Sequence, residues 1–183
     1  MHLIVGLGNI GDKYELTRHN VGFLVIDEMT KNLTTSNINN SNFHSTLLKS
    51  GYNLFSKPTT YMNNSGLAVH AIMDYYKIDL EDIIVIHDDL DLPFGAVKFK
   101  IGGGHGGHNG LRSLDSHIGK DYIRVRIGIG KPKDKSDVAN YVLSNFSKEE
   151  LNKLQDIISH TIKAIEALKT ETIEQVKTKF TLK

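Results

Sequence analysis

The chain has 183 residues, 39% of them hydrophobic and 23% charged, which fits one globular domain with a single buried core. It contains no cysteine, which excludes disulfides, thiolate metal sites and a cysteine nucleophile. No apolar run approaches the roughly 18 residues of a membrane span, and no signal sequence precedes the first predicted strand. We therefore expect a cytoplasmic protein that does not associate with membranes.

The sequence alternates between segments that are typical of strands and of helices. In chain order we predict a strand at 3–7, a helix at 21–33, a polar loop at 34–45, a strand at 52–55, a helix at 65–76, strands at 83–87 and 97–101, a helix at 111–118, a strand at 122–129 and a long helix from Ser147. This order indicates a single three-layer α/β domain over 1–183, with a mixed, mostly parallel twisted sheet flanked by helices.

The strand patterns differ in how they distribute charge. Residues 83–87 are apolar up to His87, as in a strand covered on both faces. The strands at 97–101 and 122–129 alternate instead, and we predict one solvated, basic face bearing Lys98, Lys100, Arg124 and Arg126.

The C-terminal third combines a charged segment with a helical one. Residues 131–137 read K-P-K-D-K-S-D, and we predict a mobile loop that acts as a lid over 131–145. Ser147 begins S-K-E-E, which resembles a capping box, and the apolar spacing that follows predicts a C-terminal helical segment at 147–180 that packs on the sheet.

Basic residues are concentrated between positions 95 and 135. This window carries nine basic and three acidic residues, a net charge of +6, whereas the remainder of the chain carries −5. Such segregation favours a basic face for a polyanion, although side chains dispersed over a solvated surface would give the same count.

His19 and Asp88 are the candidates for acid–base chemistry. His19 lies between the first predicted strand and its helix, and Asp88 follows a buried strand, at the edge where parallel sheets collect functional groups. A carboxylate that accepts from one imidazole nitrogen leaves the other nitrogen free to take a proton. We interpret Asp89 and Asp91 as a turn before Pro93; the alternative makes Asp88, Asp89 and Asp91 ligands for Mg²⁺.

Four asparagines have more than one interpretation. Asn63 or Asn64, and likewise Asn109, either caps the helix that follows or donates an amide hydrogen to a substrate carbonyl. Asn9 is equally plausible as a plain turn residue. The five glycines at 102–107 form neither a P-loop nor a serine elbow, so a histidine-activated water is the economical mechanism for a hydrolase.

Five ordered blocks of the sequence resemble the bacterial peptidyl-tRNA hydrolases. They read G-L-G-N-I-G-x-x-Y-x-x-T-R-H-N-x-G (6–22), P-T-T-Y-M-N-N-S-G (58–66), H-D-D-L-D-L-P-F-G (87–95), K-F-K-I-G-G-G-H-G-G-H-N-G-L (98–111) and R-I-G-I-G (126–130). The resemblance covers nearly the whole chain. It implies cleavage of the ester between a peptide and the 3′ ribose of tRNA, with the acceptor end and 3′ CCA of peptidyl-tRNA as the partner. We expect no metal and no cofactor, and we expect a monomer because the sequence shows no sustained heptad or exposed apolar stripe.

The resemblance also implies roles for individual residues. His19 matches the general base, Asp88 the acid that orients it, and Asn9 the residue that tells blocked from free aminoacyl groups. Lys100 and Arg126 match residues that hold tRNA phosphates. The positions that contact the substrate end are matched by Tyr14, Tyr61, Asn63 and Asn109, with Met62 beside them; Asn20 and His108 are neighbours without an assigned role.

The chain departs from the family pattern at a few positions. Ile10 stands where proline is usual, which loosens the turn that holds Asn9. Asp89 stands where glutamate is common, and Phe94 where proline is common. Two alternatives remain open: a metal-dependent hydrolase that uses Asp88, Asp89 and nearby histidines, and a non-catalytic RNA-binding relative with the same fold.

Overall fold

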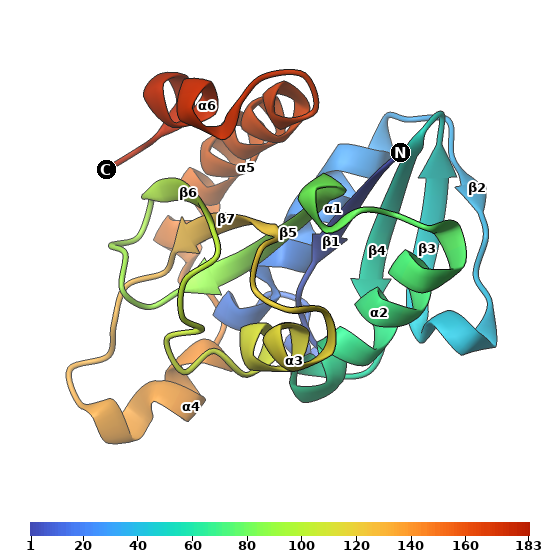
Figure 1. The fold of residues 1–183 in the computed structure, drawn as a ribbon. Helices are drawn as coiled ribbons and strands as arrows, with labels where there is room; N and C mark the ends of the chain where they lie inside the picture. The colour runs from blue at the N-terminus through green and yellow to red at the C-terminus, as the bar shows by residue number, and fades with distance from the viewer.

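One mixed, seven-stranded sheet lies between two layers of helices in the structure, a computed structural model that describes residues 1–183 (Figure 1). The strands are β1 (His2–Gly6), β2 (Ser36–Asn37), β3 (Ser45–Ser50), β4 (Asn53–Pro58), β5 (Ile83–Asp89), β6 (Val97–Ile101) and β7 (Ile123–Gly128). Their order is β2-β3-β4-β1-β5-β7-β6; the four strands from β4 to β7 run parallel, β3 and β6 run antiparallel to them, and β2 pairs antiparallel with β3. The predicted fold class is confirmed.

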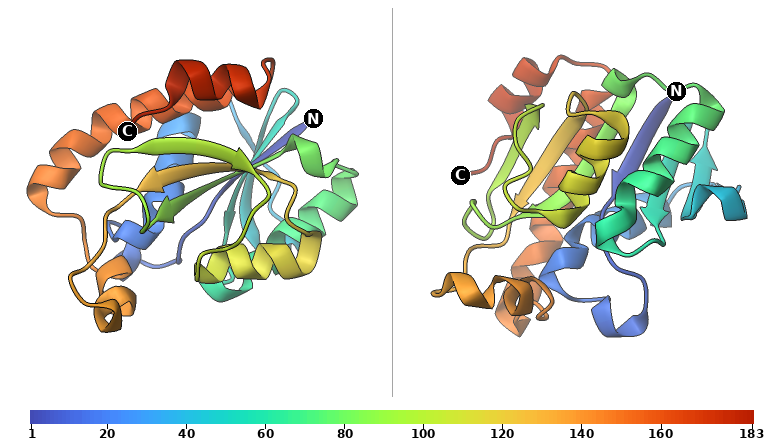
Figure 2. Two further views of the ribbon diagram at one scale, coloured as in Figure 1. Left: turned by 60° about the vertical axis from the view of Figure 1, so that its left-hand side comes forward. Right: turned by 60° about the horizontal axis from the view of Figure 1, so that its bottom comes forward.

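Six α-helices cover the two faces and the carboxyl end of the sheet. They are α1 (Val21–Lys31), α2 (Ser65–Tyr76), α3 (Asn109–Ile118), α4 (Val138–Val142), α5 (Lys148–Leu168) and α6 (Ile173–Phe180). Side chains of α1, α5 and α6 form one core with one sheet face, and those of α2 and α3 form a second core with the other. The short helix α4 lies at the end toward which β5 points (Figures 1 and 2), and its Val142 joins the first of these cores. None of these helices is long and apolar enough to cross a membrane.

The sequence predicted most of these elements but missed part of the sheet edge. The predicted loop at 34–45 contains the two-residue strand β2, and β3 was not predicted at all. In β3 four of the six residues of S-T-L-L-K-S are polar, yet antiparallel pairing with β4 makes it a strand in which Ser45 and Leu47 are buried. The 147–180 segment is helical as predicted, and it consists of two helices with capping boxes at Ser147 and Thr172.

The prediction of a solvated basic face was wrong for Arg124. Its side chain is fully buried, and its guanidinium donates to the carbonyls of Gly104 and Gly103 and to Asp115 at 2.8, 3.2 and 3.1 Å. The glycine-rich segment after β6 folds over this residue and excludes water from it. Lys100 and Arg126, on the same face, keep part of their surface exposed.

Two glycines allow α1 to begin directly against the central strands. A Cβ on Gly22 would lie 2.5 Å from the carbonyl oxygen of Ile86 in β5, and one on Gly6 would lie 2.2 Å from the carbonyl oxygen of Gly22. Real Cβ atoms do not approach other atoms this closely. The glycines therefore set how near the chain just before α1 comes to the carboxyl end of β5.

Candidate active site

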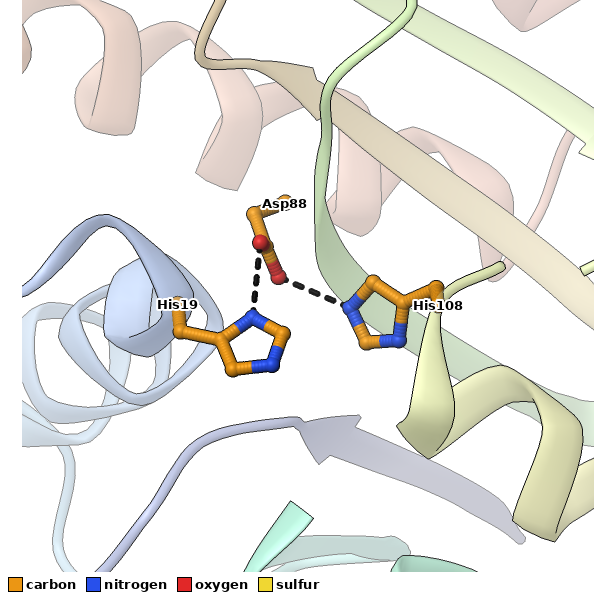
Figure 3. A group of neighbouring side chains, drawn as sticks. All are labelled: His19, Asp88 and His108. Carbon is orange, nitrogen blue, oxygen red and sulfur yellow. Dashed lines mark hydrogen bonds and ion pairs between the residues drawn. The ribbon is translucent and has the colours of Figure 1, made fainter. Parts of the chain in front are cut away.

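A buried carboxylate joins two histidines at the carboxyl end of β5. Nδ1 of His19 lies 2.8 Å from Oδ2 of Asp88, and Nε2 of His108 lies 2.8 Å from Oδ1 of the same side chain (Figure 3). His19 belongs to a 3-10 turn, Arg18–Asn20, that leads into α1, and His108 directly precedes α3. The expected contact between His19 and Asp88 is present, and His108 completes the group.

The hydrogen bonds define which nitrogen of each imidazole carries a proton. Nδ1 of His108 accepts from the backbone N–H groups of Gly110 and Leu111, so its proton is on Nε2 and is donated to Asp88. His19 donates Nδ1–H to Asp88, which leaves its Nε2 as an unprotonated acceptor with no partner in the protein. Nε2 is therefore the nitrogen that can accept a proton from another molecule.

Charge and burial shift the pKa values of Asp88 and His19 in opposite directions. Burial alone would raise the pKa of Asp88, but the charges and hydrogen bonds of His19 and His108 outweigh it and hold the pKa well below its usual value. Burial would lower the pKa of His19, and the charge and hydrogen bond of Asp88 raise it above its usual value instead. Asp88 therefore stays ionised, and His19 becomes a stronger base than a free imidazole.

A third histidine underlies the group. His87 is buried, donates Nδ1–H to the carbonyl of Asp88 at 2.8 Å, and packs its ring edge-on against His108 with centroids 5.3 Å apart. Burial, and then the charge of His108, lowers the pKa of His87 to about 4. It is therefore neutral at physiological pH, and its packing fixes the ring of His108.

A cavity of about 200 Å³ opens beside these side chains. Its walls come from the end of β5, the glycine-rich segment before α3, the basic face of β6 and β7, and helix α4. Of the predicted site residues, the cavity is lined by His19, Asp88, Asn109, Lys100 and Arg126. The predicted base, acid, amide donor and cations are far apart in the sequence, and the fold brings them together around one cavity.

Asn9 and Met62 are joined by a hydrogen bond and lie outside the lining of that cavity. Oδ1 of Asn9 accepts from the backbone N–H of Met62 at 2.8 Å, and Asn9 lines a separate hollow. The Asn20 side chain binds both backbone groups of Asn9: it accepts from the N–H at 2.8 Å and donates to the carbonyl at 2.9 Å. These two bonds fix the turn that Ile10, in place of proline, was expected to loosen.

The remaining residues that were predicted to contact the substrate also lie outside the lining of the main cavity. The rings of Tyr14 and Tyr61 meet edge-on with centroids 6.5 Å apart, and neither residue lines the main cavity. Met62 is buried against the start of α3, where a Cβ on Gly110 would lie 2.5 Å from its sulfur. Asn63, next to Met62, is exposed, and its side chain forms no cap bond.

The capping interpretation of the asparagines was wrong. The side chains of Asn63 and Asn64 form no cap bond at α2, and α3 is capped by His108 rather than by Asn109. The amide oxygen of Asn109 instead accepts from Arg112 at 3.3 Å, so its NH₂ group remains available. His108 and Asn20 are the site residues to which sequence reasoning gave no role. The signal for His108 was its place just before a predicted helix, where capping residues occur.

The basic side chains of Lys100, Arg124 and Arg126 line the same cavity and repel one another. Nε of Arg126 donates to Asp89 at 2.8 Å, and its two terminal nitrogens have no protein partner. Burial, and then the charges of Arg126 and Arg124, lowers the pKa of Lys100. A bound anion would relieve this repulsion, so the geometry suits a phosphate group.

The acidic residues after Asp88, which the alternative interpretation assigns to Mg²⁺, are paired with basic side chains. Asp89 accepts from Arg126 and, at 2.8 Å, from the N–H of Asp91, which confirms the predicted turn. Asp91 pairs with Lys131 at 2.9 Å. His19, Asp88 and His108 could offer ligand atoms within 4.8 Å of one another, but these side chains already pair through hydrogen bonds.

The fold and this histidine–carboxylate centre define a hydrolytic enzyme of the α/β class. More specifically, the chain belongs to the peptidyl-tRNA hydrolase family, whose model matches residues 3–183. It is 84% identical to the peptidyl-tRNA hydrolase of Aliarcobacter butzleri and 57% identical to that of Sulfurovum sp., in both cases over its whole length and over 100% and 97% of the relative. A crystal structure of peptidyl-tRNA hydrolase from Acinetobacter baumannii matches with a TM-score of 0.93 and 36% identity, covering 99% of this chain and 94% of that one.

Replacing Asp88 by asparagine should lower the pKa of His19. The burial that depresses the pKa remains in this variant, whereas the negative charge that raises it is gone. An NMR titration of the imidazole signals in both proteins measures the change. An unchanged His19 titration would show that Asp88 does not control its basicity.

Proposed function

We propose that this protein hydrolyses the ester between a peptide and the 3′ ribose of tRNA, releasing free tRNA and the peptide, through a water molecule activated by His19. The observation that carries the proposal is the 2.8 Å hydrogen bond from His19 to the buried, ionised Asp88, which leaves Nε2 free at the cavity. This arrangement supplies a general base without a covalent intermediate.

The reaction needs one proton transfer in each direction. Nε2 of His19 takes a proton from water as the oxygen attacks the ester carbonyl, and Asp88 stabilises the imidazolium that forms. Amide hydrogens of Asn109 or Asn63 stabilise the negative oxygen of the tetrahedral intermediate; the free NH₂ group of Asn109 at the cavity supports this role. As the intermediate collapses, the C–O bond to the ribose breaks, and His19 returns its proton to the departing oxygen.

Asn9 and the aromatic residues act on the peptide side of the ester in this proposal. Because the oxygen of Asn9 is bound to Met62, only its NH₂ group can face a ligand, and a donor favours the carbonyl of a blocked amino group over a free ammonium. Tyr14 and Tyr61 provide flat apolar surfaces beside this group.

The tRNA side of the ester is held by charge. Lys100 and Arg126 bind phosphates near the 3′ end, where contacts position the substrate without reading its sequence. The acceptor stem and the CCA end are thereby placed along the basic face of β6 and β7.

We also propose that the enzyme works as a monomer in the cytoplasm, where tRNA is found. The large exposed apolar side chains are scattered along the chain and form no single helical or strand face: Tyr52 lies in the turn between β3 and β4, Tyr75 in α2 and Ile101 at the end of β6. Light scattering tests this against the 20.4 kDa mass of one chain; a particle of twice that mass would contradict it.

Replacing His19 by alanine should reduce kcat for release from a peptidyl-tRNA mimic by about 10²–10⁴-fold, the usual contribution of a general base, with KM nearly unchanged. Because the neutral imidazole is the active form, wild-type kcat should rise with pH through the elevated pKa of His19. The variant should lack this rise. His70→Ala, on the exposed face of α2, is the control.

Activity of the His19 variant within about twofold of wild type would remove His19 from the mechanism, given the size of a general-base effect. A wild-type protein that binds tRNA without releasing peptide would instead support the non-catalytic alternative.

Replacing Lys100 by alanine or Arg126 by glutamine should mainly raise KM. Each lost phosphate contact should also reduce the slope of log affinity against log salt by about 0.7–0.9. Steady-state kinetics across a salt series measures both effects, and Lys163→Ala, on the exposed surface of α5, is the matched control. A fall in kcat at constant KM would place these residues elsewhere in the mechanism.

A further inference from the structure

Arg18, the residue before His19, makes its contacts with a part of the chain more than 120 positions away. Its NH1 donates to the carbonyls of Tyr141 and Ser144 at 3.3 and 3.4 Å, and its NH2 pairs with Glu150 at 3.1 Å. The guanidinium also lies over the ring of Tyr141, 4.2 Å from its centroid. One side chain thus holds the C-terminal end of α4 and the first turn of α5.

Backbone contacts join the same two segments. The N–H of Arg18 donates to the carbonyl of Ser144 at 3.1 Å, and the N–H of Phe146 donates to that of Leu16 at 3.0 Å. Glu150, the partner of Arg18, also accepts from the N–H of Ser147 in the capping box of α5. The 3-10 turn that carries His19 is therefore tied to the chain between α4 and α5.

Helix α4 is a wall of the cavity. Its residues Val138, Ala139 and Val142 line the space that His19 and Asp88 also line. With five residues, α4 is too short to be stable alone, so its position depends on tertiary contacts. Apart from Arg18, the main polar contact is the bond from the hydroxyl of Tyr141 to the carbonyl of Ile129 at 2.6 Å.

The contacts at the C-terminal end of α4 are more buried than those before its N-terminal end. At the C-terminal end the Arg18 side chain is 13% exposed and bonds to carbonyls that carry the negative end of the helix dipole. Before the N-terminal end, the ion pair of Lys131 with Asp91 is 63% and 60% exposed, and such pairs contribute little.

We propose that Arg18 is a positioning residue: it anchors α4 as the cavity wall that faces the substrate, and so acts on substrate binding rather than on the proton transfer. The role in binding rests on the proposed function, whereas the anchoring does not. Since His19 is held separately by Asp88, loss of Arg18 releases the wall and leaves the base in place.

The test compares Arg18→Gln, Arg18→Lys and Glu150→Gln with wild type. Arg18→Gln should raise KM about tenfold, the ratio that corresponds to one lost hydrogen bond to a charged group, with kcat within about threefold. Arg18→Lys keeps the charge but lacks the planar fork, so its KM should be intermediate. Glu150→Gln keeps an oxygen for the cap of α5 and should raise KM less.

Glu149→Gln is the matched control. Glu149 lies in the same turn of α5, its side chain is 81% exposed, and its partner is Lys153 rather than Arg18. This variant should have the KM and kcat of wild type.

A second measurement does not depend on the reaction. Trypsin should cleave after Lys133 and Lys135 several times faster in Arg18→Gln than in wild type or Glu149→Gln, because α4 is no longer fixed. If Arg18→Gln does not fold, Arg18→Lys and Glu150→Gln are judged by the same two measurements.

Unchanged KM and unchanged cleavage in the variants, with only a lower melting temperature, would overturn the proposal and leave Arg18 a purely structural residue. A loss of kcat at constant KM would also overturn it, because Arg18 would then act on His19. Faster cleavage in a protein that shows no hydrolysis would keep the anchor and refute the proposed function.

Discussion

The buried carboxylate of Asp88 is the group around which the site is arranged. A charge with this little exposure is costly unless donors surround it, and here one donor comes from each side: His19 before α1 and His108 before α3. These histidines are 69 and 20 residues away in sequence. Satisfying one carboxylate therefore fixes how the chain before α1 and the chain before α3 meet at the end of β5.

The same bonds that stabilise the fold determine the chemistry. Because Asp88 accepts from Nδ1 of His19, the free nitrogen faces the cavity, and its basicity is raised. Because His108 caps α3 with its other nitrogen, its own tautomer is fixed as well. Three features of the fold position the site: the cap of α3 by His108, the turn held by Asn20 and the close approach of Gly22 to β5.

Sequence reasoning succeeded where the pattern is local. The continuous apolar run of β5, the capping box at Ser147 and the alternation of β6 follow directly from burial and hydrogen-bonding rules. It failed for β3, whose mostly polar sequence forms a strand by pairing with β4, and for Arg124, whose pattern is that of an exposed strand residue. In both places a distant segment, rather than the local pattern, decides the environment.

The sequence by itself determined the α/β class, the family resemblance and the pairing of His19 with Asp88, because these depend on periodicity and on motifs at strand ends. Only the tertiary structure decided that His108 shares the carboxylate, that Asn20 holds Asn9, and that Arg18 reaches α4. The physical reason is that a hydrogen bond needs two groups within about 3 Å of each other. Which distant groups come that close is settled by the packing of helices on the sheet, and no local pattern records it.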